Sequence, residues 1–166
     1  INVVYQELML APHLSAAENI CLGPSAIRRG PVISWKAMHD RAAEIMEMLG
    51  VKVDVDLAVR QLNVAQQQLV EIARALQRKS RILVLDEPSA VLGRDNMDTL
   101  FEAIRRLVQQ QVSVVYISHR LEEVFRIAER VTVLKDGALV GTREIRELDQ
   151  DKLVSMMIGR QLSSVF

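Results

Sequence analysis

The stretch Ile82-Leu83-Val84-Leu85-Asp86-Glu87-Pro88 decides the fold of this 166-residue chain. Its first four residues form a short, continuously apolar run, which is typical of a strand buried on both faces of a parallel sheet. Two adjacent carboxylates follow at the carboxyl end of that strand, where α/β proteins place their ligands. The stretch therefore predicts an α/β sheet with a candidate polar site at one edge.

Strands and helices alternate after this run, and one more strand is expected in the apolar opening of the chain, residues 1–5. The expected elements after residue 90 are an amphipathic helix at 100–108, a strand at 112–117, a short helix at 121–128 and a strand at 131–134. Asp136-Gly137 then predicts a two-residue hairpin turn. We expect a mostly parallel sheet with one antiparallel hairpin at its C-terminal end.

Helical patterns fill the part of the chain between the first strand and Leu76. Apolar residues from Met38 to Leu49 recur at helical spacing, with Ser34 as the expected N-cap and Gly50 as the expected end. A second helix is expected to begin after Asn63. Glycines and prolines between residues 22 and 32 predict a surface loop.

Composition excludes several classes of function. Apolar residues make up 49% of the chain, and the 21 basic residues equal the 21 acidic ones, so we expect no nucleic-acid partner. A single cysteine, Cys21, permits no internal disulfide and fits a reducing compartment. Neither a membrane-spanning run nor a signal peptide is visible, which predicts a soluble, cytoplasmic domain.

Four features of the sequence could carry chemistry. Asp86 can hold Mg²⁺ through its water shell, and Glu87 can polarise a water for attack on a phosphoryl group. His119 follows the strand at 112–117, so the same sheet edge is expected to present it. Residues 62–68 precede a helix whose N-terminus would bind an anion, and Gln6 follows the first strand. The structural alternatives are an Asp86 that caps a turn, a hydrogen-bonded His119 and a simple N-cap at Asn63.

The order of these features resembles the nucleotide-binding subunits of ABC transporters over essentially the whole chain. The matching motifs are the Q-loop glutamine Gln6, the signature loop at 62–66, the Walker B aspartate Asp86, the catalytic glutamate Glu87, the D-loop at 89–93 and the switch histidine His119. The resemblance implies an α/β P-loop NTPase core plus a helical subdomain. It divides the chain into the end of the Q-loop strand (1–7), the helical subdomain (8–78) and the rear part of the core (79–166).

The same resemblance implies the cofactors and the role of each residue. ATP and Mg²⁺ are expected, with Asp86 and Gln6 around the metal and Glu87 orienting the attacking water. His119 would contact the γ-phosphate. A signature loop formed by Asn63, Val64, Ala65 and Gln66 would meet the ATP held by an opposing cassette.

A narrower resemblance concerns the solute. Residues 33–38, 64–73 and 156–160 are similar to the first of two tandem cassettes in bacterial importers of ribose, xylose, galactose or autoinducer-2. This resemblance implies carbohydrate uptake, with a second cassette in the same polypeptide or in a homodimer, a membrane permease that contacts the helical subdomain, and a periplasmic sugar-binding protein acting indirectly. The expected location is the cytoplasmic face of the inner membrane, and the sequence does not name the sugar.

Some positions depart from the family pattern. No stretch reads G-x-x-x-x-G-K-[ST], the loop that cradles nucleotide phosphates, so we expect a core that is incomplete at its N-terminus and inactive by itself. Asn63 and Ala65 replace the usual serine and second glycine of the signature, and Gly93 occupies a D-loop position that is often polar. Two alternatives remain open: a non-hydrolysing, truncated or regulatory half-cassette, and a DNA-repair ATPase of the SMC type.

Overall fold

The computed structural model describes residues 1–22, 28–29, 32–78, 80–90, 92 and 94–158. Val91 and Gly93 of the predicted D-loop, Gly159 and Arg160 of the last motif, and most of the predicted loop at 22–32 lie outside these residues. The chain divides into two compact units, Ile1–Ile117 and Ser118–Phe166. The subdomain limits expected after residues 7 and 78 stay a prediction.

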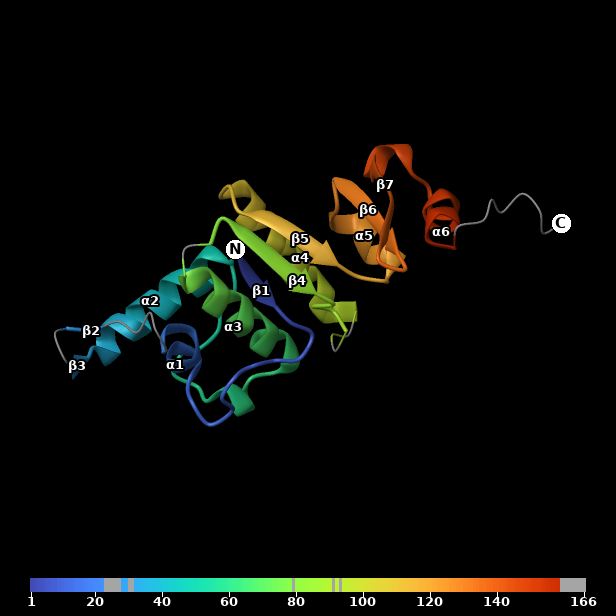
Figure 1. The fold of residues 1–166 in the computed structure, drawn as a ribbon. Helices are drawn as coiled ribbons and strands as arrows, with labels where there is room; N and C mark the ends of the chain where they lie inside the picture. Colours follow the sequence, from blue (N-terminus) through green and yellow to red (C-terminus); the bar gives the residue numbers. More distant parts are fainter. Residues whose placement is uncertain (23–27, 30–31, 79, 91, 93, 159–166) are drawn as a thin grey trace. The chain divides into compact units, whose positions relative to one another are not determined.

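A parallel sheet organises the first unit. Strands β1 (Asn2–Val4), β4 (Ile82–Asp86) and β5 (Ser113–Ile117) lie side by side in the order β1-β4-β5 (Figure 1). Val4 pairs with Leu85, and Leu85 pairs with Tyr116, all in parallel register. This arrangement confirms the predicted parallel sheet and brings the carboxyl ends of the three strands to one edge.

Burial alternates along the central strand. Leu83 and Leu85 are fully buried, whereas Ile82, Val84 and Asp86 are half-buried. The covered face packs against helices α3 (Val64–Gln77) and α4 (Arg94–Gln109), because α3 contacts β1, α4 contacts β5, and the two helices contact each other. The prediction that β4 is buried on both faces is therefore wrong for the described residues, among which helices cover one face.

Three helices that lie between β1 and β4 in the sequence pack against one another. Helices α1 (Ala16–Cys21) and α2 (Trp35–Met48) contact each other and α3, and their buried residues are apolar apart from Asn19. Short strands β2 (Arg28–Arg29) and β3 (Val32–Ile33) pair within the stretch that the sequence predicts as a loop, and a 3₁₀ turn spans Val59–Gln61.

The ends of these helices follow local chemistry. Ser15 caps α1 through a capping box with Glu18. Ser34 stands at the expected N-cap of α2, although its side chain makes no capping bond. At the other end, Gly50 has a φ of +75° and its N–H bonds to the Glu47 carbonyl, while the Val51 N–H reaches the Met46 carbonyl. These two bonds form a Schellman motif, which confirms Gly50 as the stop signal.

The second unit is a hairpin with two short helices. Helix α5 (Leu121–Ile127) precedes the antiparallel strands β6 (Arg130–Lys135) and β7 (Ala138–Glu144), and α6 (Gln150–Ile158) follows a 3₁₀ turn at Ile145–Glu147. Asp136 and Gly137 have φ values of 49° and 77°, as a type I′ turn requires. The predicted hairpin is confirmed. None of the helices in the described part of the chain has the length and apolarity needed to cross a bilayer.

Candidate functional site

The carboxyl end of β4 presents two successive carboxylates. Asp86 is the last residue of the strand and Glu87 follows it, both half-buried. The Glu87 N–H donates to the Ile117 carbonyl at 2.9 Å, so the end of β5 fixes the backbone of Glu87. Glu87 has a φ of +47°, which turns the chain out of the sheet directly after the strand. The predicted pair therefore lies at the sheet edge, as the sequence suggests.

A tight turn carries the chain away from Glu87. The Ala90 N–H donates to the Glu87 carbonyl at 3.0 Å, with Pro88 and the fully buried Ser89 inside the turn. This second position of the turn favours proline, because the proline ring already sets φ near −65°. The Leu92 N–H then bonds to the Ser89 carbonyl at 3.0 Å. These bonds make the described part of the predicted D-loop an ordered turn.

Gln6 lies at the same edge of the sheet. It follows Val4 by two residues, and Val4 pairs in parallel with Leu85, which precedes Glu87 by two residues. The structure thus brings Gln6 to the level of the carboxylates, one strand away from them. Its side chain is exposed, so it is accessible to a ligand at this edge.

The residues of the predicted signature loop begin helix α3. Asn63 Oδ1 accepts the Gln66 N–H at 2.9 Å, and Gln66 Oε1 accepts the Asn63 N–H at 3.1 Å. This capping box confirms the structural interpretation of Asn63. Val64 is exposed and Ala65 is buried, so the first turn of α3 presents Asn63, Val64 and part of Gln66 to solvent. The proposed phosphate contact is untested and stays a prediction.

His119 belongs to the second unit, so its predicted meeting with Glu87 stays a prediction. The histidine is exposed, and the residues on either side of it are tied to one buried carboxylate, Glu123. Ser118 Oγ donates to Glu123 Oε2 at 3.2 Å, and Arg120 Nη1 lies 2.9 Å from Glu123 Oε1. The sequence reasoning missed Glu123. The available signal was the position of Glu123, on the inward side of the short helix that begins just after His119.

The residues at the sheet edge fit a magnesium ion. Mg²⁺ takes one or two carboxylates, keeps several waters and completes its shell with substrate phosphates. Asp86 and Gln6 supply a carboxylate and an amide oxygen at neighbouring strand ends. Within the described residues, no group of three or more histidines, cysteines, aspartates and glutamates gathers as a metal cage. The donor set therefore suits an ion that arrives with a phosphate-bearing substrate.

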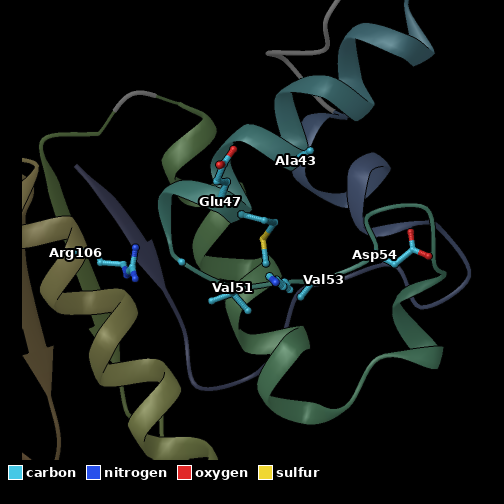
Figure 2. A pocket seen from close by; sticks show the side chains of 9 residues that line it. Ala43, Glu47, Val51, Val53, Asp54 and Arg106 are labelled. Atoms are coloured by element: carbon cyan, nitrogen blue, oxygen red, sulfur yellow. The ribbon is translucent and has the colours of Figure 1, made fainter.

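A separate cavity of about 640 Å³ lies at the C-terminal end of α2 (Figure 2). Glu47 and Val51 line it from the α2 side, while Arg106 reaches it from α4. None of the predicted site residues lines this cavity. Its lining is open and mixes both signs of charge through Glu47, Lys52, Asp54 and Arg106, so it offers no complementarity to a phosphate group.

Solved structures that match this chain include ATP-binding cassettes. The cassette MJ0796, solved as a dimer in a post-hydrolysis state with ADP and Pi, matches with a TM-score of 0.70 and 29% identity over 87% of this chain and 62% of that one. The ADP conformation of MJ1267, a cassette of an ABC transporter, has a TM-score of 0.76 over 95% of this chain and 68% of that one. At 23% identity, MJ1267 supports the fold alone. The fold is that of an ATP-binding cassette.

The sequence model of the ABC transporter family matches residues 1–90, and the chain belongs to that family. Ribose import ATP-binding protein RbsA 3 of Rubrobacter xylanophilus is 46% identical over all 166 residues, which cover 33% of that protein. The ribose import ATP-binding protein RbsA of Caldanaerobacter subterraneus is 45% identical, and the chain covers 34% of it. The chain thus spans about a third of the length of the curated relatives it matches. These findings confirm the predicted family and fold class.

Proposed function

We propose that the polypeptide carrying this sequence hydrolyses ATP to drive import of a sugar through an ABC transporter. The observation that supports it most directly is the Asp86-Glu87 pair held at the sheet edge, with Gln6 at the neighbouring strand end. Similarity to ribose import ATP-binding proteins over the whole chain supports the solute class.

Each residue at the edge has a role in this proposal. Glu87 accepts a hydrogen bond from the water that attacks the terminal phosphoryl group, and its backbone bond to Ile117 keeps the carboxylate in place. Asp86 and Gln6 hold Mg²⁺, in part through water, and the ion neutralises charge that develops on the phosphate oxygens. His119 contacts the γ-phosphate from the second unit.

The first turn of α3 serves a different nucleotide in this proposal. Because Asn63 Oδ1 is used for the cap, the side-chain amide is the group that donates to a phosphate oxygen of the ATP on an opposing cassette. The backbone N–H groups of Val64, Ala65 and Gln66 stand at the positive end of the helix dipole. The partners are a second cassette and a permease that contacts the helical region, at the cytoplasmic face of the inner membrane, with a periplasmic sugar-binding protein upstream.

The test is ATP turnover by the complete polypeptide and its Glu87→Gln variant. Removing the base lowers turnover about a hundredfold or more, while ATP binding measured by calorimetry is retained. Glu102→Gln, on the exposed face of α4, is the matched control and keeps turnover. Unchanged turnover in Glu87→Gln contradicts the proposed role of Glu87.

The 166 residues by themselves are expected to be inert. No glycine in them is followed by lysine, so the phosphate-cradling loop is not within this sequence. Calorimetry of the isolated 166-residue chain should give no MgATP binding. Clear affinity there would favour a half-cassette that binds nucleotide through other groups.

A further inference from the structure

Helix α3 carries a buried carboxylate that the proposed reaction does not use. Glu71 is 7% exposed, and its neighbours on the same helix, Val70 and Ile72, are fully buried and apolar. Arg74, one turn later, places Nη1 3.6 Å from Glu71 Oε2. The two residues form an ion pair with one member inside the protein and the other, Arg74, partly exposed.

This ion pair is attached to the backbone of Met9. The Met9 carbonyl accepts a hydrogen bond from Arg74 Nη1. The Met9 N–H faces the Glu71 carboxylate and acts to lower the pKa of Glu71. The Met9 side chain is 64% exposed, so packing of that side chain does not hold the segment. Met9 lies three residues after Gln6, and the Glu71–Arg74 pair therefore fastens the segment that follows Gln6 to helix α3.

A buried carboxylate at this position destabilises the folded protein through desolvation of its charge. Burial raises the pKa of Glu71, and the Arg74 charge and the Met9 N–H oppose that rise. Glu71 Oε2 is buried and accepts no hydrogen bond from the described protein atoms. An apolar side chain of similar volume would avoid the desolvation of a charge, but it would remove the carboxylate that holds Arg74 beside the Met9 carbonyl.

We propose that Glu71, supported by Arg74, is a positioning residue that couples Gln6 to the signature loop. Helix α3 is the connection: Asn63 caps its first turn, and Glu71 lies eight residues later, about 12 Å along the axis at 1.5 Å per residue. A displacement of the α3 N-terminus is thus carried to Met9 and from there to Gln6. The reaction it serves is the ATP hydrolysis proposed above, on which this inference rests.

The first experiment measures hydrogen exchange of residues 6–10 in the complete polypeptide, without nucleotide. Glu71→Met removes the carboxylate that holds Arg74 on the Met9 carbonyl and faces the Met9 N–H, and exchange in this segment should accelerate about tenfold or more. Glu71→Gln keeps an oxygen beside Arg74 and should stay close to the natural protein. The matched control is Glu102→Met, which breaks an exposed Glu–Arg pair of the same spacing on α4. Unchanged exchange in Glu71→Met overturns the proposal.

Arg74→Ala provides an independent variant if Glu71→Met does not fold. Arg74 is partly exposed, and its loss frees the Met9 carbonyl without removing the buried carboxylate. Faster exchange at residues 6–10 is again the expected result. Exchange equal to that of the natural protein in Arg74→Ala overturns the contribution of Arg74.

The second experiment measures ATP turnover in a double-mutant cycle with Gln6→Ala. Glu71→Met should lower kcat about tenfold to a hundredfold, as loss of an outer support for a metal ligand does, and Glu71→Gln should restore most of it. In the Gln6→Ala background, Glu71→Met should have almost no further effect, because it acts through Gln6. Additive losses overturn the coupling. A natural protein that does not hydrolyse ATP instead contradicts the proposed function, and the exchange experiment still decides whether Glu71 holds the segment.

Discussion

The backbone N–H of Glu87 donates to the carbonyl of Ile117 at 2.9 Å while Glu87 itself has a φ of +47°. The end of β5 therefore holds the end of β4 in a conformation that side chains with a Cβ adopt at a cost of about 1–2 kcal/mol. Strain of this kind concentrates at functional positions, where the surrounding structure maintains it. A glutamate here is better explained by chemistry than by stability.

The first prediction concerns the backbone of Glu87. Glycine adopts positive φ without strain, so Glu87→Gly should exceed Glu87→Ala in free energy of unfolding by about 1 kcal/mol. Both variants lack the carboxylate and should lose ATP turnover equally. Urea denaturation of the two proteins measures the difference. If Glu87→Ala is the more stable of the two, the positive φ is not a source of strain.

The second prediction concerns Gly50 and Arg106, which meet where α2 ends. A Cβ on Gly50 would lie 2.4 Å from Arg106 Nε, and Gly50 has a φ of +75°. Gly50→Ala should lower the free energy of unfolding by about 1–2 kcal/mol, since it adds backbone strain and displaces the guanidinium.

The double variant Gly50→Ala with Arg106→Ala separates the two causes. It removes the steric contact and keeps the positive φ, so Gly50→Ala should be less harmful in the Arg106→Ala background. An equal cost in both backgrounds would assign the whole effect to the backbone.

The third prediction tests the capping box of α3. Asn63→Ala removes the acceptor of the Gln66 N–H and should cost about 1 kcal/mol of stability. Asn63→Asp keeps the acceptor and should be nearly neutral in stability. ATP turnover should follow the opposite order. Asn63→Asp should lower turnover more than Asn63→Ala does, because the aspartate places a negative charge beside the proposed phosphate and the alanine does not. Thermal unfolding together with ATP turnover would show both effects.

Local rules predicted much of this fold. Alternation of apolar runs and helical spacing located β4, β5 and α4, and the Asp136-Gly137 turn was readable because both residues tolerate positive φ. The burial of β4 was not predictable in the same way. The apolar run of β4 indicates that both faces of the strand can be covered. Which elements cover each face depends on the whole fold.

The candidate site was predictable where it depends on strand ends and not where it depends on tertiary contacts. Asp86 and Glu87 lie where a parallel strand must end, and parallel pairing brings Gln6 to the same edge. The supporting carboxylates Glu71 and Glu123 escaped sequence reasoning because a glutamate on a helix is usually exposed. The capping sequence from Ser15 to Glu18 was a signal for α1 that local rules could have used.

The last prediction concerns the part of the pH dependence of stability that arises from Glu71. Burial raises its pKa above the ordinary value of 4.5, so the native protein binds this proton more tightly than the unfolded chain does. The contribution of Glu71 to stability is therefore most favourable below 4.5, and it declines as the pH rises through the raised native pKa. Glu71→Gln cannot titrate and lacks this decline. Urea denaturation of both proteins at a series of pH values should show the natural protein losing stability relative to Glu71→Gln as the pH increases from 4.5 upward. A relative stability that stays constant, or that rises with pH, would mean that Arg74 and the Met9 N–H outweigh the desolvation of the carboxylate.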